Sequence, residues 1–513
     1  MIRLIDVLLN RITTYRLLLY HLISLILLAA ILAIARVIPI SPGALLSTAA
    51  IYLAVTLCAN WVFARLFRVD ANRESTIITA VILTLISGPV SIASDPVHAG
   101  YLALAGLFAV ASKYLLAIRR QHIFNPAAFG IFLTGILFGQ YSTWWVGNIA
   151  MLPLVVVGGL LVLRKMNRFR MAGLFFAAQI VFLFAQGIWQ GIGAATALAS
   201  VSFAFLRAEI VFAAVVMVTE PLTSPKVFPK QAVYAVITAF FFLPQINIYG
   251  FAISPEAALL IGNLFSYLAS PGFKLVLRLK ERREIGPNIM AFTFAYPRGF
   301  KHKLGQYMEW TIPLRERDSR GNRRCFSIAS SPTESELMIA VRFHDDSSAY
   351  KRAMATMRPG DRMVAAELGG EFVLPSDPSE PLAFIAGGIG ITPFRSMIKY
   401  LVDTGERRSI VLLYANSRKE EIVFAELLKE AEEKIGVKVV YTLTDTRRVT
   451  DQWSGRIGPV SEGMIHEEVP DYRYRHFYVS GPLTMVVGVR SVLRSIGIRP
   501  SRIRTDLFSG YVA

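Results

Sequence analysis

Two short stretches in the second half of the chain carry residue types that suit nucleotide chemistry. In "AGGIGITP", Gly387, Gly388 and Gly390 stand between an apolar run and Thr392. Glycines leave the backbone open to close approach, and the helix expected from Thr392 offers free N–H groups and a positive dipole end to a phosphate. A glycine cluster of this kind also serves as a plain turn between strand and helix, so the context has to decide.

The second stretch is "RRCFSIASSP", in which Arg324, Phe326 and Ser327 form an Arg-x-aromatic-Ser pattern within an expected strand. An arginine can neutralise a pyrophosphate, an aromatic ring can flank a flavin ring system, and a hydroxyl can reach the flavin nitrogen N5. Each of these residues by itself suits a core or surface position equally well.

Further motifs follow in a fixed order around these two. They are "LGQYMEW" (304–310), "DDSSAYKRAM" (345–354), "GGEF" (369–372), "YVSGPLTM" (478–485) and "DLFSGY" (506–511). The series covers residues 275–513 and resembles the ferredoxin–NADP reductase family. This resemblance implies a barrel that binds FAD, followed by a domain that binds NADH or NADPH.

The resemblance also implies roles for individual residues. Arg324, Phe326 and Ser327 would bind FAD, and Ser347 or Ser348 would help to hold its pyrophosphate. The implied nicotinamide dinucleotide positions are Gly387, Gly388, Gly390, Thr392, Gly481 and Pro482. Phe508 or Tyr511 would cover the flavin face.

Two positions depart from the family pattern. Ser480 stands before Gly-Pro, at the hydride-transfer position where a cysteine is common, and Asp506 stands where a glutamate is common. Because the cofactors perform the hydride transfer, we expect these changes to alter rate rather than reaction type. We take Ser327 and Ser480 as the residues nearest the chemistry. Arg418 follows the second strand and could meet a 2′-phosphate or be a solvated charge, so NADH and NADPH both remain open.

Alternating and turn-bounded runs predict the elements that position these residues. Residues 271–290 are expected to link two domains, and residues 271–378 to form a small antiparallel β-barrel. The expected strands are "KLVLRLKERREI", "IMAFTFAYP", "GQYMEWTIP", "RRCFSIASS", "ELMIAVRFH" and "DRMVAAEL". Residues 379–513 alternate strands and helices, which predicts a parallel α/β sheet.

Residues 1–270 differ sharply from this second half, because long apolar runs follow one another with short polar gaps. The chain of 513 residues is 54% hydrophobic, and its mean hydropathy is +0.48. We therefore expect a polytopic α-helical membrane domain of about ten spans. The expected spans begin near Leu17, Leu45, Ser75, Ala99, Pro126, Trp144, Ala172, Ser200, Gln231 and Pro255.

Basic residues cluster at alternate ends of these spans. The clusters lie around Arg16, Arg68, Arg119, Arg164, Lys226 and Lys274. The positive-inside rule then predicts a multi-pass protein of the bacterial cytoplasmic membrane with both termini and the second half in the cytoplasm. An even number of spans requires "GIGAATALAS" (191–200) to be an outer loop or re-entrant segment.

Two helix-breaking motifs stand out in this membrane half, "QHIFNPAAFG" with Asn125 and "MVTEPLTSPK" with Thr219 and Glu220. Broken helices in membranes usually line a site or cavity. Together with "STIITAVILTLISGP" (75–89), they resemble the flavin-carrying membrane subunits of the sodium-translocating NADH:quinone reductase and of the Rnf complex. This resemblance implies flavin, FMN or riboflavin, inside a ten-helix domain.

Those families attach FMN to a threonine in a Ser-Gly-Ala-Thr motif. The nearest match is "GAAT" (193–196), which makes Thr196 a partial candidate only. A non-covalent flavin near Asn125 and the Thr219–Glu220 turn is the alternative that we favour.

Composition excludes several other classes. Only 2 Cys and no CxxC pair argue against thiolate-held zinc or iron–sulfur clusters, so no metal site is expected. Of 7 His, only His21, His98 and His122 precede residue 270, and no two share a span, which argues against stacked haems. The net charge of +18 fits cytoplasmic loops near anionic lipid better than nucleic acid.

The predicted function is oxidation of NADH or NADPH at a cytosolic FAD, with electrons passed to a membrane flavin and on across the bilayer or to a quinone. An extracytoplasmic flavoprotein is a further candidate partner. Two other interpretations stay open: an ion-pumping redox protein, and a soluble-type flavin reductase with a membrane anchor.

Overall fold

The computed structural model describes residues 9, 12–69, 73–118, 121–206, 209–244, 246–248, 250–270, 274–297, 299–314, 322–344, 347–448 and 453–508. The side chains of residues 121, 206, 251, 507 and 508 lie outside this description. The chain divides into two compact units, Met1–Phe273 and Lys274–Ala513. This division lies close to the predicted boundary at residue 270, and each unit is described by itself.

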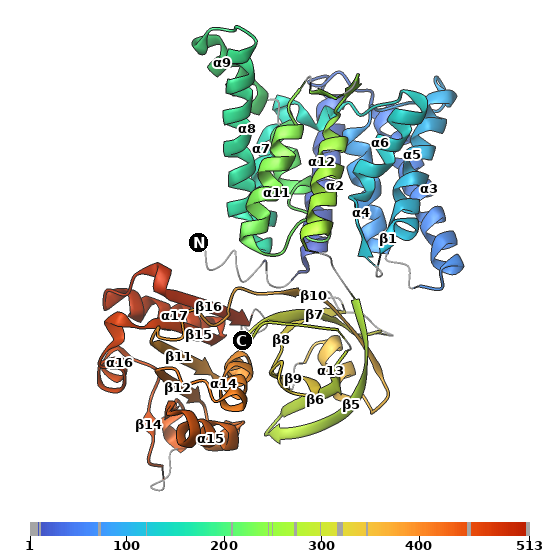
Figure 1. The fold of residues 1–513 in the computed structure, drawn as a ribbon. Helices are drawn as coiled ribbons and strands as arrows, with labels where there is room; N and C mark the ends of the chain where they lie inside the picture. The colour runs from blue at the N-terminus through green and yellow to red at the C-terminus, as the bar shows by residue number, and fades with distance from the viewer. Residues whose placement is uncertain are drawn as a thin grey trace. The chain divides into compact units, whose positions relative to one another are not determined.

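The first unit is helical (Figure 1). Its α-helices are α2 (Thr14–Ile34), α3 (Pro42–Leu66), α4 (Arg73–Ile86), α5 (Pro96–Leu115), α6 (Pro126–Phe138), α7 (Leu152–Met166), α8 (Phe169–Trp189), α9 (Ala194–Leu206), α10 (Glu209–Phe212), α11 (Phe228–Phe241) and α12 (Pro255–Ala269). The π-helical segment η3 (Ala213–Met217) continues α10. Two short hairpins, β1 (Ala117–Ile118) with β2 (Gln121–His122) and β3 (Asn247–Ile248) with β4 (Phe251–Ala252), complete the unit.

The two halves of this unit repeat one order of elements. In the first half, α4 is followed by a turn ending in Pro89, then α5, the β1–β2 hairpin, and α6 with Pro126 in its first turn. In the second half, η3 is followed by a turn ending in Pro221, then α11, the β3–β4 hairpin, and α12 with Pro255 in its first turn.

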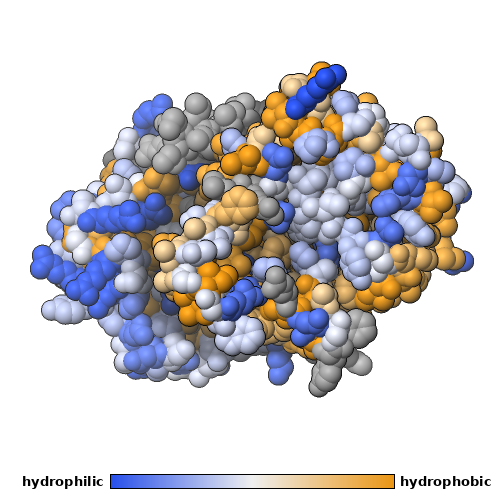
Figure 2. Space-filling view, turned by 90° about the horizontal axis from the view of Figure 1, so that it is seen from above, coloured by the Kyte–Doolittle hydropathy of each residue, from blue (hydrophilic) through white to orange (hydrophobic). Residues whose placement is uncertain are grey.

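Four helical segments are long and apolar enough to cross a membrane: Thr14–Ile34, Pro42–Leu66, Ile149–Met166 and Phe169–Trp189. The pair formed by α9 and the α10–η3 segment adds a fifth if it is one bent span. The other described helices are shorter or less apolar, because turns such as those at Pro89 and Pro221 interrupt them. The number of ten crossings therefore remains a prediction. Large apolar side chains are exposed along this unit, Ile34, Leu46 and Val181 among them, and Figure 2 shows orange, apolar areas on the surface seen from above.

The segment "GIGAATALAS" differs from the expected loop. Helix α9 begins at Ala194 and includes Thr196 in its first turn. Helix α9 begins directly after Gly193, so the connection from the end of α8 at Trp189 is short. A re-entrant path for α9 and α10 remains a prediction.

The second unit begins with six strands, all at the predicted places. They are β5 (Lys274–Gly286), β6 (Ile289–Ala295), β7 (Tyr307–Thr311), β8 (Arg323–Ser327), β9 (Glu336–Arg342) and β10 (Arg362–Gly369). They form one antiparallel sheet in the order β8-β7-β10-β5-β6-β9. The amide of Ala329, just after β8, donates to the carbonyl of Met338 in β9 at 2.8 Å. This contact joins the two edge strands at one end, while closure into a barrel stays a prediction.

The remaining residues form the predicted parallel α/β sheet. Its strands are β11 (Leu382–Gly387), β12 (Ile410–Asn416), β13 (Lys438–Leu443), β14 (Arg456–Ile457), β15 (His476–Pro482) and β16 (Ile503–Phe508). Its helices are α14 (Thr392–Thr404), α15 (Ala425–Ile435), α16 (Glu462–Glu468) and α17 (Leu483–Ser495), and α13 (Ala349–Ala355) belongs to the antiparallel sheet (Figure 1). Residues 419–421 form a separate 3-10 turn, and helix α15 begins after it at Ala425.

Candidate functional site

The strand order of the parallel sheet fixes where a ligand would bind. The order is β14-β13-β12-β11-β15-β16, so the chain moves from β11 to one side and later returns to the other. The order reverses between β11 and β15, and ligands of such sheets bind outside the carboxyl ends of the strands at that point. The turn at Gly387–Ile391 and the Gly481–Pro482 pair both lie there.

The glycines at this point make room mainly for the chain itself. A Cβ on Gly387 would lie 2.0 Å from Sδ of Met485, and a Cβ on Gly390 would lie 2.3 Å from the carbonyl oxygen of Ser480. Protein atoms therefore occupy the Cβ positions of these two glycines, and contact of their backbone with a ligand stays a prediction. Gly388 differs, because its φ is +52° and its nearest neighbour would be a guanidinium nitrogen of Arg342 at 3.5 Å.

Helix α14 starts directly after this turn. Its N-cap residue, Ile391, makes no side-chain cap, and the Thr392 hydroxyl donates to the Ile389 carbonyl at 3.1 Å. The first-turn N–H groups are therefore not taken up by a capping side chain, which leaves them suited to an anionic group. Thr392 itself is buried and serves the turn.

The predicted flavin-binding residues gather at β8 and α13. Arg324 donates to Oγ of Ser348 at 3.3 Å, and its guanidinium carbon lies 5.1 Å from the centre of the Tyr350 ring. Phe326 lies on the same side, with its ring 6.0 Å from that of Tyr350. Ser348 is the N-cap of α13, whereas the Ser347 hydroxyl is turned to the carbonyl of His344. Of the two serines that the sequence left open, Ser348 is the one beside Arg324.

Ser327 and Ser480 come together through Asp506. The Ser327 hydroxyl donates to Oδ2 of Asp506 at 3.2 Å. Asp506 in β16 is the register partner of Ser480 in β15, which in turn pairs with Ala386 at the end of β11. Burial raises the pKa of Asp506 from 3.8 to about 6, against the lowering effect of the Ser327 hydrogen bond. The buried Ser480 hydroxyl has no hydrogen-bond partner among the described residues.

Other predicted positions at this site are only partly visible. The backbone of Phe508 pairs with Pro482, but its side chain lies outside the described residues, as does all of Tyr511. Arg418 is exposed after β12. NADH and NADPH therefore remain alternatives.

Arg342 and Glu421 were missed by sequence reasoning. Arg342, at the end of β9, makes an ion pair with the buried Glu421 beyond β12. No motif marked either residue, because β9 and β12 belong to different sheets and only the folded chain places Arg342 beside the Gly388 turn.

These residues fit a flavin dinucleotide and a nicotinamide dinucleotide. A guanidinium beside a helix-capping serine suits a pyrophosphate, and a half-buried aromatic ring suits a planar ring system. The unpartnered Ser480 hydroxyl and the open side of Gly388 are two places, within the described part of this unit, that lack a close protein neighbour.

In the first unit, the two helix-breaking motifs meet. Nδ2 of Asn125 donates to Oε2 of Glu220 at 2.7 Å, and Thr223 donates to the same oxygen at 3.0 Å. The backbone N–H of Asn125 donates to Asn263 of α12 at 2.8 Å. The first repeat thus contacts the second through a buried polar network. Asn263 had no signal in the sequence, since a lone Asn in an apolar helix usually only packs.

Thr219 and Thr196 do not belong to this network. The Thr219 hydroxyl donates to the carbonyl of Val215 at 3.0 Å, which satisfies it within the π-helical segment. Thr196 is exposed on α9, and α9 lies at the end of the unit opposite the β1–β2 hairpin that precedes Asn125 (Figure 1). Thr196 therefore lies apart from Asn125, whereas Thr219 directly precedes Glu220, the partner of Asn125.

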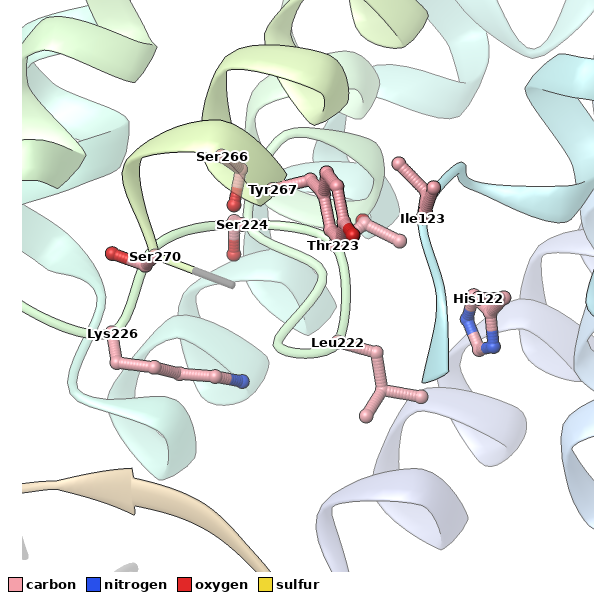
Figure 3. Close-up of a pocket in the computed structure, with 9 residues that line it drawn as sticks. All are labelled: His122, Ile123, Leu222, Thr223, Ser224, Lys226, Ser266, Tyr267 and Ser270. Carbon is pink, nitrogen blue, oxygen red and sulfur yellow. The ribbon is translucent and has the colours of Figure 1, made fainter. Parts of the chain in front are cut away.

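A small pocket lies beside the network. Its lining combines hydroxyls, one lysine and a few apolar side chains: His122, Ile123, Leu222, Thr223, Ser224, Lys226, Ser266, Tyr267 and Ser270 (Figure 3). Its volume of about 30 Å³ is room for about one water. A flavin ring system does not fit this space, so the residues here do not support a bound flavin as they stand.

Glu256 is a second buried carboxylate that sequence reasoning missed. It lies in the first turn of α12, where Oε1 accepts hydrogen bonds from Ser142 and from Nε1 of Trp144, the latter at 2.7 Å. Its Oε2 has no hydrogen-bond partner in the described part of the chain. Trp144 has a φ of +45°, a strained value for a bulky residue.

Comparisons with known proteins concern the second half of the chain. Residues 384–491 match the family model described as oxidoreductase NAD-binding domain. The reductase component of stachydrine N-demethylase from Rhizobium meliloti is 26% identical over 45% of this chain and 66% of its own length. NADH-cytochrome b5 reductase 1 from Aspergillus oryzae is 26% identical over 44% of this chain and 79% of its own.

Two other matches cover a similar share of this chain. The glycine betaine monooxygenase reductase component from Chromohalobacter salexigens is 25% identical over 41% of this chain and 56% of its own. The crystal structure of the cytochrome P450 reductase GcoB from Amycolatopsis has a TM-score of 0.42 at 22% identity, over 46% of this chain and 70% of that one. Each of these similarities spans less than half of this chain.

Proposed function

We propose that this chain, whose second unit is an NAD(P)H-dependent FAD oxidoreductase of the ferredoxin–NADP reductase type, passes electrons from NAD(P)H into its helical unit. From there they cross the membrane or reach a quinone. Within the second unit, the observation that best supports transfer from NAD(P)H to FAD is the Ser327–Asp506 hydrogen bond. It joins the strand of the flavin motif to the strand beside Ser480, where a nicotinamide would lie.

The chemistry of the reaction belongs to the cofactors: FAD, when bound, accepts a hydride and gives up electrons singly. The protein residues bind and orient. Arg324 and Ser348 would hold the pyrophosphate, and Phe326 would flank the ring system. The turn at Gly387–Ile391 and the first turn of α14 would hold the dinucleotide phosphates. Ser327 provides a hydroxyl that donates to Asp506. The Asp506 carboxyl can take up or release a proton near pH 6, since burial raises its pKa to about 6.

The membrane part of the proposal is supported by charge. Basic residues stand in the last turns of α3, α5 and α7, namely Arg65, Lys113, Arg164 and Lys165. These three alternate helices end as expected if their ends face the cytoplasm, whereas α9 and α11 have no basic residue in their last turns. The second unit and both termini would then be cytoplasmic, in a bacterial cytoplasmic membrane.

The polar network of Asn125, Glu220 and Asn263 is where we place entry of electrons into the helical unit. It joins both repeats, as sites of broken-helix membrane proteins do. The resemblance to the membrane part of the sodium-translocating quinone reductase suggests FMN or riboflavin as the carrier, but the pocket of about 30 Å³ is too small for either. We derive no step through such a flavin. The acceptor beyond is proposed by class alone: a quinone or an extracytoplasmic flavoprotein.

Flavin analysis of the detergent-purified full chain tests this proposal. FAD plus a second flavin, or NAD(P)H-driven reduction of a quinone that ceases in Asn125→Ala, would support a conduit. Asn125→Ala should keep wild-type reduction of ferricyanide, which takes electrons directly from soluble flavoproteins. One FAD per chain and an unchanged quinone activity in Asn125→Ala would leave the anchored reductase as the answer.

A second candidate function is ion movement coupled to electron flow, and Glu256 favours it. A fully buried carboxylate with one unpartnered oxygen, as described in this unit, is costly unless it binds a proton or cation. In proteoliposomes, NAD(P)H oxidation would then build a membrane potential that Glu256→Gln abolishes while ferricyanide reduction persists. Electron flow without any potential in the wild-type chain would reject this function.

A further inference from the structure

The second unit contains a buried clamp that joins the flavin-motif strand to the helix after the glycine turn. Glu334 lies in the connection that follows β8, and Arg395 lies in the first turns of α14. The two carboxylate oxygens of Glu334 accept from both terminal nitrogens of Arg395, one of them at 2.8 Å. Bidentate pairs of this kind fix both distance and orientation.

Backbone contacts reinforce the clamp on both sides. Arg395 also donates to the carbonyl of Ala329 at 3.1 Å, and its neighbour Ser396 donates to the carbonyl of Ser330 at 2.7 Å. On the other side, the backbone N–H of Ser331 donates to Glu334 at 2.6 Å. Both Arg395 and Ser396 are buried, so the connection from 329 to 334 is held against α14 through several hydrogen bonds.

The clamp joins two segments that lie next to the predicted cofactor-binding motifs. Ala329 follows Ser327 of the flavin motif by two residues, and Arg395 follows Thr392 by three. The clamp therefore ties the strand that would carry the flavin to the helix that would carry the dinucleotide. A second joint between the two sheets lies at Val373, whose carbonyl accepts from both Tyr478 and Arg504 at 2.8 Å.

We propose that Glu334 and Arg395 are positioning residues that set the distance between the bound nicotinamide and the flavin. This rests on the proposed function of the second unit. In the reaction, the dihydronicotinamide is oxidised by loss of a hydride, which carries two electrons and one proton to the flavin. Hydride transfer depends steeply on distance, and a displacement of about 1 Å costs on the order of 100-fold in rate. Neither side chain is required to touch either cofactor.

The test is rapid-mixing measurement of flavin reduction in the FAD-loaded full chain, with whichever of NADH and NADPH the wild-type chain oxidises. Glu334→Gln keeps the shape of the side chain but removes its charge. We expect its limiting rate of flavin reduction to fall by about 10- to 100-fold. The nucleotide concentration at half-maximal rate should change by less than about threefold, and the long-wavelength charge-transfer absorbance should weaken.

Two further variants separate positioning from folding. Arg395→Lys keeps the positive charge but loses the paired hydrogen bonds of the guanidinium. Its rate of flavin reduction should lie between those of the wild type and Glu334→Gln, with FAD retained. Glu430→Gln removes an exposed pair with Lys434 on α15 and should leave rate and absorbance unchanged. If Glu334→Gln does not retain FAD, the rate of flavin reduction is measured in Arg395→Lys instead.

Unchanged rate and charge-transfer absorbance in FAD-loaded Glu334→Gln or Arg395→Lys would overturn the proposal. So would equal losses in the Glu430→Gln control. A wild-type chain whose flavin is reduced by neither nucleotide would instead reject the proposed function of the unit.

Discussion

Replacing Asp506 by Asn is expected to stabilise the second unit at pH 8 more than at pH 5. Asp506 of β16 is half-buried, accepts a hydrogen bond from Ser327, and has its pKa raised from 3.8 to about 6 by its partial removal from water. The folded state therefore holds the proton more tightly than the unfolded chain does. Below pH 3.8 the carboxyl is protonated in both states and costs nothing. As the pH rises toward 6, only the unfolded state gains the charge freely, so folding becomes less favourable.

The pKa rise from 3.8 to about 6 corresponds to about 3 kcal/mol at pH 8, and about half of that applies at pH 5. Asn cannot ionise, so it removes this penalty at both pH values. Any free-energy cost of burying the new amide does not depend on pH, so it is the same at pH 5 and at pH 8. The stabilisation by Asp506→Asn should hence be larger at pH 8 by about 1.4 kcal/mol, a tenfold change in an equilibrium constant.

Hydrogen exchange of peptides from β15 and β16 in the full chain measures this difference, once corrected for the intrinsic pH dependence of exchange. The control is Asp377→Asn, at an exposed aspartate whose pKa is lowered by hydrogen bonds from Ser379. The pKa of Asp377 lies below 3.8 in the folded state, so its carboxylate is ionised in both states at pH 5 and at pH 8. The control variant should therefore change stability equally at the two pH values. Equal stabilisation by Asp506→Asn at pH 5 and pH 8 would refute the reasoning.

Two other predictions concern packing and metals. Gly390→Ala should destabilise the second unit by about 1–3 kcal/mol in thermal unfolding, because its Cβ would lie 2.3 Å from the Ser480 carbonyl oxygen. Gly463→Ala, where nothing lies within 4 Å, should change stability by no more than about 0.5 kcal/mol, and similar losses for both variants would contradict the packing argument. Chelators should leave NAD(P)H oxidation unchanged, since the described residues include no group of three metal-ligating side chains; activity lost with a chelator and regained with a metal would show that a site was missed.

The sequence predicted the elements of the second unit well, because local patterns encode them. Alternating runs bounded by turns predicted all six strands of the antiparallel sheet, and the apolar runs before Gly387 and Asn416 predicted parallel strands. The order of motifs predicted the flavin and nucleotide residues, and these roles stay predictions.

In the first unit, the sequence predicted which residues interrupt helices but not what they contact. Asn-Pro and Glu-Pro are local signals, since proline removes a donor and fixes φ. That Asn125 binds Glu220, and that Thr219 does not take part, depends on how two distant segments pack. Thr196 was a candidate by motif alone, and its place on α9 separates it from that network.

What the sequence by itself determined is therefore the class of chemistry: the nucleotide motifs, their order, and the division into an apolar and a polar half. Only the tertiary structure decided which side chains meet. Ser327 reaches Asp506, Arg395 reaches Glu334, and Trp144 reaches Glu256 across separations that no local pattern records. The physical reason is that hydrogen bonds and ion pairs depend on distances of a few ångströms, which packing of the whole unit sets.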